Sequence, residues 1–193
     1  MTPARAAAPV KLILAATFLA LAVAVLLTSR AHGSTSGWTA YLAPSGTCPG
    51  SDNRAASSAA QGRAIRCLVN WARARAGRHG LNPSPELHRA AVLKGRGVAS
   101  CRQFSHAPCN SGVTDAVRRS GYPYASFGEN LFVGMSRQIS AQDVVGAWLA
   151  SPPHRANVLG AGFRDVGLAG VPARGIIGDG DSVVWVAAFG TRR

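Results

Sequence analysis

The fold of this chain is decided by residues 148–159, which read WLASPPHRANVL. The segment begins as the end of an amphipathic helix, and two prolines then interrupt it. Pro152 disfavours the α-helical region for Ser151, and Pro153 suits the first position of a new short helix. His154 then lies in the first turn, where the helix dipole lowers the pKa of an imidazole and keeps the ring neutral. A neutral imidazole suits a metal ligand or a hydrogen-bond acceptor, although a capping or packing role is the more ordinary explanation.

Composition indicates one globular domain. The 193 residues are 47% hydrophobic and only 15% charged, which is typical of a chain with a packed core. The formal net charge is +13, and only Lys11 and Lys94 are lysines. A basic surface can attract nucleic acid, anionic lipid or an anionic wall polymer. The arginines are scattered from Arg54 to Arg193, so we favour codon bias as their origin and expect no nucleic-acid partner.

The first 33 residues have the pattern of an export segment. Arg5 and Lys11 supply positive charge, an apolar run follows at residues 12–27, and small and polar residues come next. The run is slightly long for a signal peptide and slightly short for a membrane span. Residues 1–33 are therefore expected to be a cleaved signal peptide or an anchor on the outer face of the membrane. Either alternative exports the rest of the chain.

Export changes how the four cysteines are interpreted. Cys48, Cys67, Cys101 and Cys109 all follow the leader, and an even number in an exported chain predicts two disulfides. Three pairings are possible, and we prefer the local one, Cys48–Cys67 with Cys101–Cys109. The closely spaced CxxC pairs that are typical of zinc sites do not occur in the sequence.

The folded domain is predicted to span residues 54–193. Residues 34–53 are rich in Gly, Ser, Thr and Pro, and are expected to be a linker or an arm pinned by Cys48. Within the domain, periodicity and capping residues predict helices at about 55–76, 84–100, 114–120 and 140–150, and strands at about 131–134, 166–171 and 183–189. On the first helix, the arginines are expected to lie opposite the apolar stripe.

Several short motifs occur in order along the chain. They are LVNWAR at 68–73, FSH at 104–106, GENL at 128–131, the 148–159 segment, F…VG at 163–167 and WVAAFG at 185–190. Together they resemble the CAP superfamily of cysteine-rich secretory proteins, insect venom antigens and plant pathogenesis-related proteins. The likeness covers residues 64–190 and is closest to the exported bacterial branch. It implies an α+β fold, a three-layer α-β-α sandwich with a small antiparallel sheet and a cleft on one side.

The resemblance also implies a set of cleft residues. In the superfamily the cleft holds two histidines and two acids, and some members bind zinc or another divalent ion there. By motif, the histidines are His106 and His154 and the first acid is Glu129. The place of the second acid falls at or near Ser151, so a mechanism that needs paired carboxylates is not expected. The residues expected to support the cleft are Ser105, Asn130, Ser151 and Asn157.

The residues themselves allow two kinds of chemistry. Two imidazoles and one carboxylate suit zinc, with a fourth position open to a water that could be activated for hydrolysis. The alternative is a polar network in which the carboxylate orients a neutral histidine and nothing is turned over. We favour an exported module that binds an extracellular ligand, partner or cell-wall component. The alternative is a metal-dependent hydrolase acting on an extracellular or wall polymer, and membrane contact is expected only through the N-terminal segment.

Overall fold

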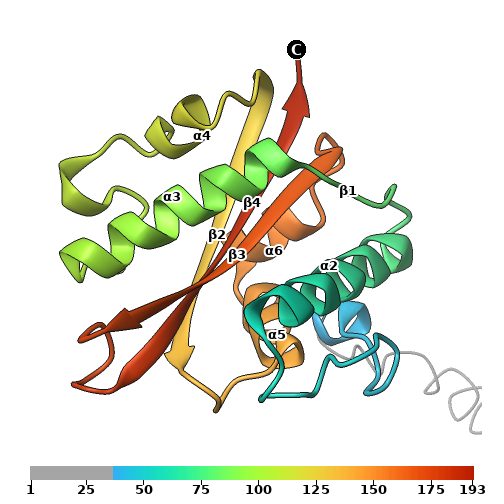
Figure 1. Cartoon of the computed structure of the whole chain (residues 1–193). Coiled ribbons are helices and arrows are strands. Elements are labelled where there is room, and N and C mark those ends of the chain that lie inside the picture. The colour runs from blue at the N-terminus through green and yellow to red at the C-terminus, as the bar shows by residue number, and fades with distance from the viewer. Residues whose placement is uncertain (1–36) are drawn as a thin grey trace, which may run out of the picture. The chain divides into compact units, whose positions relative to one another are not determined.

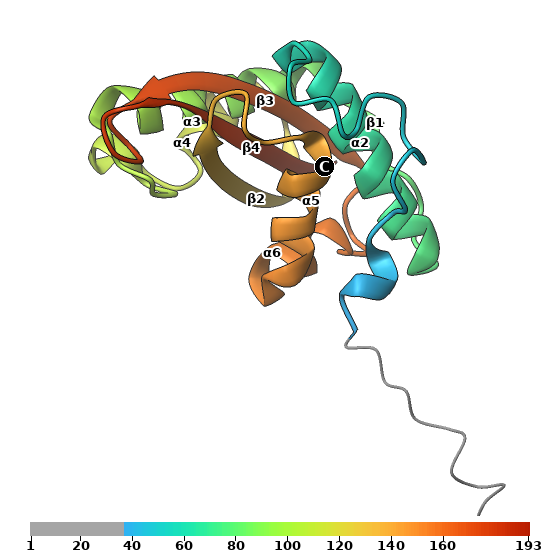
Figure 2. The ribbon, with the colours of Figure 1, turned by 90° about the horizontal axis from the view of Figure 1, so that it is seen from below.

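A four-stranded sheet lies between two layers of helices in this computed structural model, which describes residues 37–193 (Figure 1). The predicted leader at residues 1–33 lies outside the described part. Within residues 37–193, no helix has the length and apolar character needed to cross a membrane. The predicted α-β-α sandwich is confirmed, with α3 and α4 on one face of the sheet and α2, α5 and α6 on the other (Figure 2).

The elements follow one another as α2 (Ser58–Arg75), β1 (Asn82–Pro83), α3 (Pro85–Cys101), α4 (Asp115–Arg119), β2 (Tyr124–Met135), α5 (Ala141–Ala150), α6 (Pro152–Val158), β3 (Asp165–Arg174) and β4 (Asp181–Arg192), with 3-10 turns η2 (Thr39–Tyr41) and η3 (Pro108–Asn110). The strand order is β1-β3-β4-β2. The three long strands are antiparallel, and the two-residue β1 adds a parallel pairing to β3. The sheet is therefore mixed at one edge. Strand β1 is short because α3 begins at Pro85.

Alternation along β4 divides the interior into two apolar layers. Successive side chains of a strand point to opposite faces. Every second residue of β4 therefore packs with α2, α5 and α6, and the residues between them pack with α3 and α4. The first set is Trp185, Ala187 and Phe189, and the second is Val184, Val186 and Ala188. The predicted core positions Trp148 and Trp185 are each 1% exposed, and Phe163 stacks on Phe189 with ring centroids 5.6 Å apart.

Capping residues place the helix starts. Ser84 accepts a hydrogen bond from the Leu87 amide at 3.2 Å, and Pro85 takes the first helical position. Ser140 and Asp143 form a capping box at the start of α5. The start of α6 was predicted at Pro153, which is wrong by one residue. Pro152 holds Ser151 extended, so Ser151 becomes the N-cap and Pro152 itself the first helical residue.

The strands are longer than predicted, most of all β2. It begins at Tyr124, seven residues before the predicted start at Leu131. Residues 124–130 contain Ser, Gly, Glu and Asn, which lack an apolar pattern of their own. They are extended because they pair with the C-terminal half of β4, and this partner lies too far along the chain for local periodicity to show it.

One arginine of α2 contradicts the prediction that all its arginines lie opposite the apolar stripe. Arg73 is fully buried, with 0% exposure. Its guanidinium donates to the carbonyls of His79, Val158 and Gly160 at 2.8, 2.9 and 2.9 Å, and to that of Phe163 at 3.2 Å. A planar group with five donors can satisfy several carbonyls at once, so it fastens α2 to the segment that follows α6.

Both predicted disulfides are present, Cys48–Cys67 and Cys101–Cys109. The first joins the N-terminal arm to the middle of α2. Ala43 and Cys48 are buried in the core that α2 shares with α5, so this segment packs as an arm and not as a free linker.

Candidate binding cleft

The cleft is built around the edge strand β2. Glu129 lies opposite Ala188 of β4, and Asn130 lies opposite Ala187. Because neighbouring side chains point to opposite faces, Glu129 faces the layer of α3 and Asn130 faces the layer of α6. β2 is the last strand of the sheet, so residues from both layers can meet around its outer edge.

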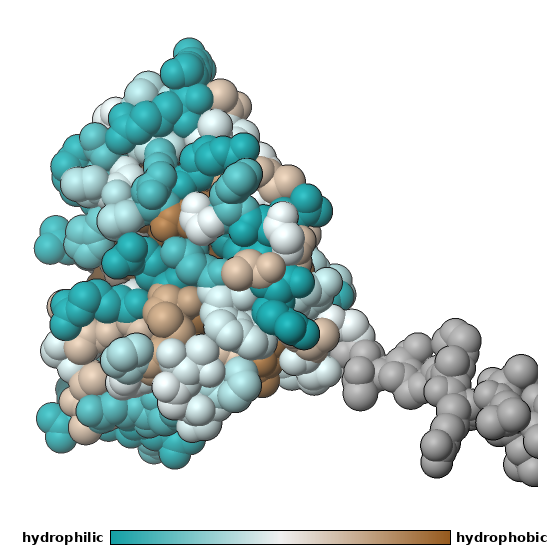
Figure 3. All heavy atoms as spheres, turned by 90° about the vertical axis from the view of Figure 1, so that its right-hand side faces the viewer, coloured by the Kyte–Doolittle hydropathy of each residue, from teal (hydrophilic) through white to brown (hydrophobic). Residues whose placement is uncertain are grey.

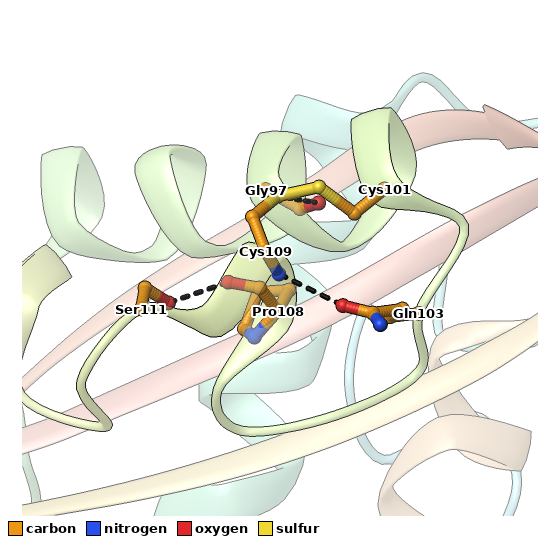
Figure 4. Close-up of a disulfide and its surroundings, with 6 residues drawn as sticks. All are labelled: Gly97, Cys101, Gln103, Pro108, Cys109 and Ser111. Carbon is orange, nitrogen blue, oxygen red and sulfur yellow. Dashed lines mark hydrogen bonds between the residues drawn. A yellow bond between two sulfur atoms is a disulfide. The ribbon is translucent and has the colours of Figure 1, made fainter.

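A disulfide-closed loop carries His106 to this edge. Helix α3 ends at Cys101, and its C-cap Arg102 is in the left-handed conformation, with φ of 50°. The Cys101–Cys109 bridge returns the loop to the helix end (Figure 4). Inside the loop, the backbone amide of Cys109 donates to Oε1 of Gln103 at 2.8 Å. Just after the loop, the Ser111 hydroxyl donates to the Pro108 carbonyl at 2.6 Å. The loop conformation is thus held by covalent and hydrogen bonds at both ends.

Glu129 lies at the centre of a polar network. Its Oε1 accepts a hydrogen bond from Nδ1 of His106 at 2.8 Å and lies 3.5 Å from Nζ of Lys94. The Glu129 and Lys94 side chains are 4% and 2% exposed, whereas the His106 side chain is 46% exposed. Lys94 also donates to the carbonyls of His106 and Val113. The buried carboxylate is therefore neutralised from below by an ammonium, and an imidazole covers it on the solvent side.

His154 approaches from the opposite layer. The side-chain amide of Asn130 donates to the His154 carbonyl at 2.9 Å. The side-chain amide of Asn157 donates to Oδ1 of Asn130 at 2.8 Å and to the Glu129 carbonyl at 3.2 Å. Through these bonds, the two asparagines hold the backbone of β2 against that of α6 beside the cleft. Burial lowers the pKa of His154, and the nearby His106 lowers it further, which favours the neutral form of the ring.

A pocket of about 300 Å³ opens beside His154. Its other lining residues are mainly apolar and come from the loop before His106, from β2 and from α5, namely Phe104, Leu131, Phe132, Val133, Ala147, Trp148 and Ser151. Phe104 is 50% exposed. An apolar hollow with one neutral imidazole and one hydroxyl at its side suits a ligand with an apolar group and few polar atoms.

The structure thus brings His106 to Glu129, places His154 close by, and puts Ser151 in the adjoining pocket. Ser105 does not take part in the network, because its exposed hydroxyl accepts from the Ala107 amide at 3.1 Å and shapes the loop. Lys94 is the site residue that sequence reasoning missed. A signal was present, since position 94 falls on the buried stripe of Leu87, Ala91 and Val98.

The donor set does not fit a ready metal centre. Among residues 37–193, no group of three or more His, Cys, Asp and Glu side chains has the arrangement needed to hold a metal ion. Oε1 of Glu129 is engaged by His106 and faced by the Lys94 ammonium. A positive side chain so close to the carboxylate opposes a second cation, so we derive no chemistry through a metal.

The sequence profile of the cysteine-rich secretory protein family, CAP, matches residues 67–189. This chain belongs to the CAP family. The uncharacterized protein YkwD of Bacillus subtilis (strain 168) is 29% identical over 110 residues, a stretch that covers 56% of this chain and 42% of YkwD. The matched part of this CAP protein therefore spans less than half of that relative.

Solved structures share the fold. An extracellular protein containing a SCP domain from Bacillus anthracis superposes with a TM-score of 0.59 at 19% identity, over 70% of this chain and 41% of that one. An outer surface protein from Borrelia burgdorferi also has a TM-score of 0.59, at 17% identity over 72% of this chain and 97% of that one. At these identities the likeness establishes the CAP fold alone.

Proposed function

We propose that this CAP domain is an exported, non-catalytic module that binds an extracellular ligand at the cleft of His106, Glu129 and His154. The observation that carries the proposal is the closed network of Glu129, Lys94 and His106 beside an apolar pocket. A carboxylate that is 4% exposed, hydrogen-bonded to His106 and ion-paired with Lys94 is committed to holding the cleft together. A general base, in contrast, must reach the proton that it removes.

Export is supported by three independent features. Residues 1–33 have the pattern of a leader. Two disulfides close the domain, and such bonds persist in oxidising compartments. The Bacillus anthracis relative is described as extracellular and the Borrelia burgdorferi relative as an outer surface protein.

The chemistry of the cleft suggests the class of ligand. Phe104 and the wall of the pocket offer apolar contact, and the neutral His154 ring offers a hydrogen-bond acceptor or donor. With Nδ1 of His106 bonded to Glu129, Nε2 is the ring nitrogen left for a ligand. A component of the cell wall with an apolar group and a few polar atoms fits this arrangement, and it is the ligand class we propose.

The deciding experiment pairs metal titration with sedimentation on purified cell-wall polymer. Chelator-treated protein is titrated calorimetrically with zinc, as wild type, His106→Ala and His154→Ala, with the exposed His79→Ala as a matched control. We expect no binding of zinc at micromolar concentrations. Zinc binding that is micromolar or tighter and lost in both cleft variants but kept in His79→Ala would instead support the hydrolase alternative.

The sedimentation arm tests ligand binding directly. Phe104 lies on the surface of the pocket and outside the core, so Phe104→Ser should leave the fold intact while removing apolar contact. We expect wild-type protein to sediment with the polymer and Phe104→Ser to do so several-fold less. Equal sedimentation of both proteins, or none of the wild type, would contradict a binding role for this pocket.

A further inference from the structure

The two edges of the sheet differ in how their backbone groups are satisfied. Along β2, the carbonyls of Glu129 and Leu131 accept hydrogen bonds from the side chains of Asn157 and Trp148, at 3.2 and 3.1 Å. At the other edge, β1 pairs with only the first two residues of β3. Beyond Val166, no strand in residues 37–193 pairs with that edge. It is a free sheet edge, which natural proteins normally cover or blunt.

A hollow of about 670 Å³ runs along this free edge. Residues 166–170 of β3 line one side, and residues from the first half of α2 and from the first half of α3 form the walls. The volume lies within the range of roughly 300–1,000 Å³ that is usual for ligand sites. Because β3 and β2 lie on opposite sides of β4, this groove is separate from the cleft at His154.

The walls of the groove are apolar and positively charged. Arg63 and Arg66 on α2 and His88 on α3 are its titratable lining residues, and none of the lining residues is Asp or Glu. The face of the molecule that carries α2 is largely hydrophilic, with smaller hydrophobic patches set between the polar residues (Figure 3). Positive side chains beside apolar surface favour a ligand that carries both negative charge and apolar groups.

The β3 side of the groove distinguishes a peptide from a lipid. The Leu168 carbonyl accepts a hydrogen bond from Nδ1 of His88 at 2.7 Å, so it faces the groove. Because hydrogen-bonding directions repeat every second residue, Gly170 presents the next backbone groups and Pro172, which has no N–H, ends the run. An acyl chain would leave these groups unpaired at a cost in free energy. An extended peptide supplies both donors and acceptors.

We propose that this groove binds an extended acidic peptide, which adds to β3 as a parallel strand. Strand β1 already shows the pairing, since the Ser84 amide donates to the Val166 carbonyl at 3.0 Å. The chain then leaves the sheet because Pro85 begins α3. A ligand strand continues the same ladder along β3. At Leu168, a backbone N–H of the ligand replaces the His88 imidazole as the donor to the carbonyl.

Side-chain alternation of the ligand matches the two walls. In a strand held parallel to β3, every second side chain faces α2 and the others face α3. Glutamates on the first set meet Arg63 and Arg66, and valines on the second set meet Val92. The charge pairing sets which face of the peptide turns toward which wall, and the backbone ladder sets its direction.

The test uses fluorescence anisotropy with a labelled hexapeptide of alternating Glu and Val and the full purified chain. Two further peptides carry N-methyl groups on either all Val or all Glu residues. In a parallel strand only one of these sets directs its N–H groups to β3. We expect one methylated peptide to lose at least tenfold in affinity while the other binds like the parent. Equal affinity of the two methylated peptides would refute backbone hydrogen bonding between the peptide and β3.

Charge-reversed variants test the walls. We expect the double variant Arg63→Glu/Arg66→Glu to lose at least tenfold in affinity, while Arg75→Glu, on the same helix outside the groove, binds like wild type. A melting temperature within a few degrees of wild type verifies the fold. Unchanged affinity in the double variant, or saturable binding of phosphatidylglycerol vesicles that the peptide does not displace, would overturn the proposal. His106→Ala should bind the peptide normally, which separates this test from that of the cleft.

Discussion

Replacing Lys94 tests the central contact of the cleft most directly. Lys94→Met keeps the length of the side chain and removes the ammonium 3.5 Å from Oε1 of Glu129. At that distance, two unit charges interact by about 5 kcal/mol at an effective dielectric constant of 20. The variant also removes the donor that serves the carbonyls of His106 and Val113. The buried carboxylate of Glu129 then has no cationic partner, although its bond to His106 remains. We therefore expect a loss of about 3–5 kcal/mol in the free energy of unfolding.

The assay is urea unfolding at pH 7 with disulfides intact, followed by circular dichroism as a two-state transition. The double variant Lys94→Met/Glu129→Gln should be more stable than the sum of the single losses predicts, by about 2 kcal/mol. Arg96→Met, which removes the same charge from the exposed side of α3, should change stability by no more than about 0.5 kcal/mol. Additive single losses, or a Lys94→Met variant as stable as Arg96→Met, would refute a stabilising interaction between Lys94 and Glu129.

Three further predictions follow from the fold. Arg73→Lys leaves several buried carbonyls without a donor and should cost about 3 kcal/mol in urea unfolding, whereas the exposed Arg75→Lys should cost almost nothing; equal effects would contradict the multiple bonds of Arg73. The pKa of His154 is lower in the folded state than in the unfolded chain. The unfolded chain therefore binds more protons as the pH falls below about 6.5, and the free energy of unfolding should decrease there. His154→Gln should flatten this part of the profile of stability against pH, and an unchanged profile would count against the shift. The Cys48–Cys67 bridge closes a separation of 19 residues, so the double serine variant should lose about 3 kcal/mol, measured as a lower urea midpoint.

Local chemistry predicted the helix boundaries well. Ser84 with Pro85, and Ser140 with Asp143, are capping patterns whose geometry depends on residues three or four positions away, and the structure has both. The length of β2 could not be predicted in this way. Its first half is extended because of pairing with β4, which lies some 60 positions further along the chain, and no local pattern encodes that contact.

The site shows the same division. The motif around residue 129 and the proline break before residue 154 marked the positions to examine, but their convergence came from the family likeness and not from spacing. Lys94 was missed because a lysine within a helix is ordinarily taken as solvent-exposed. The periodicity of α3 already placed position 94 on the buried side. A charged residue on an apolar stripe implies a buried partner, and Glu129 was an available acid of opposite charge.

The backbone carbonyls at the two edges of the sheet have different hydrogen-bond partners. This difference explains how one small sheet can carry two different binding surfaces. At β2, side-chain donors occupy the carbonyls of Glu129 and Leu131, so a ligand beside them binds through the histidines and the apolar wall of the cleft. At β3, one imidazole occupies one carbonyl, and exchange of that single bond exposes the backbone for strand pairing. His88→Ala separates the two cases, because it removes the imidazole that competes with an incoming amide. It should strengthen binding of the Glu–Val peptide at β3 and leave polymer binding at the cleft unchanged, and weaker peptide binding would show that His88 contacts the ligand instead of making way for it.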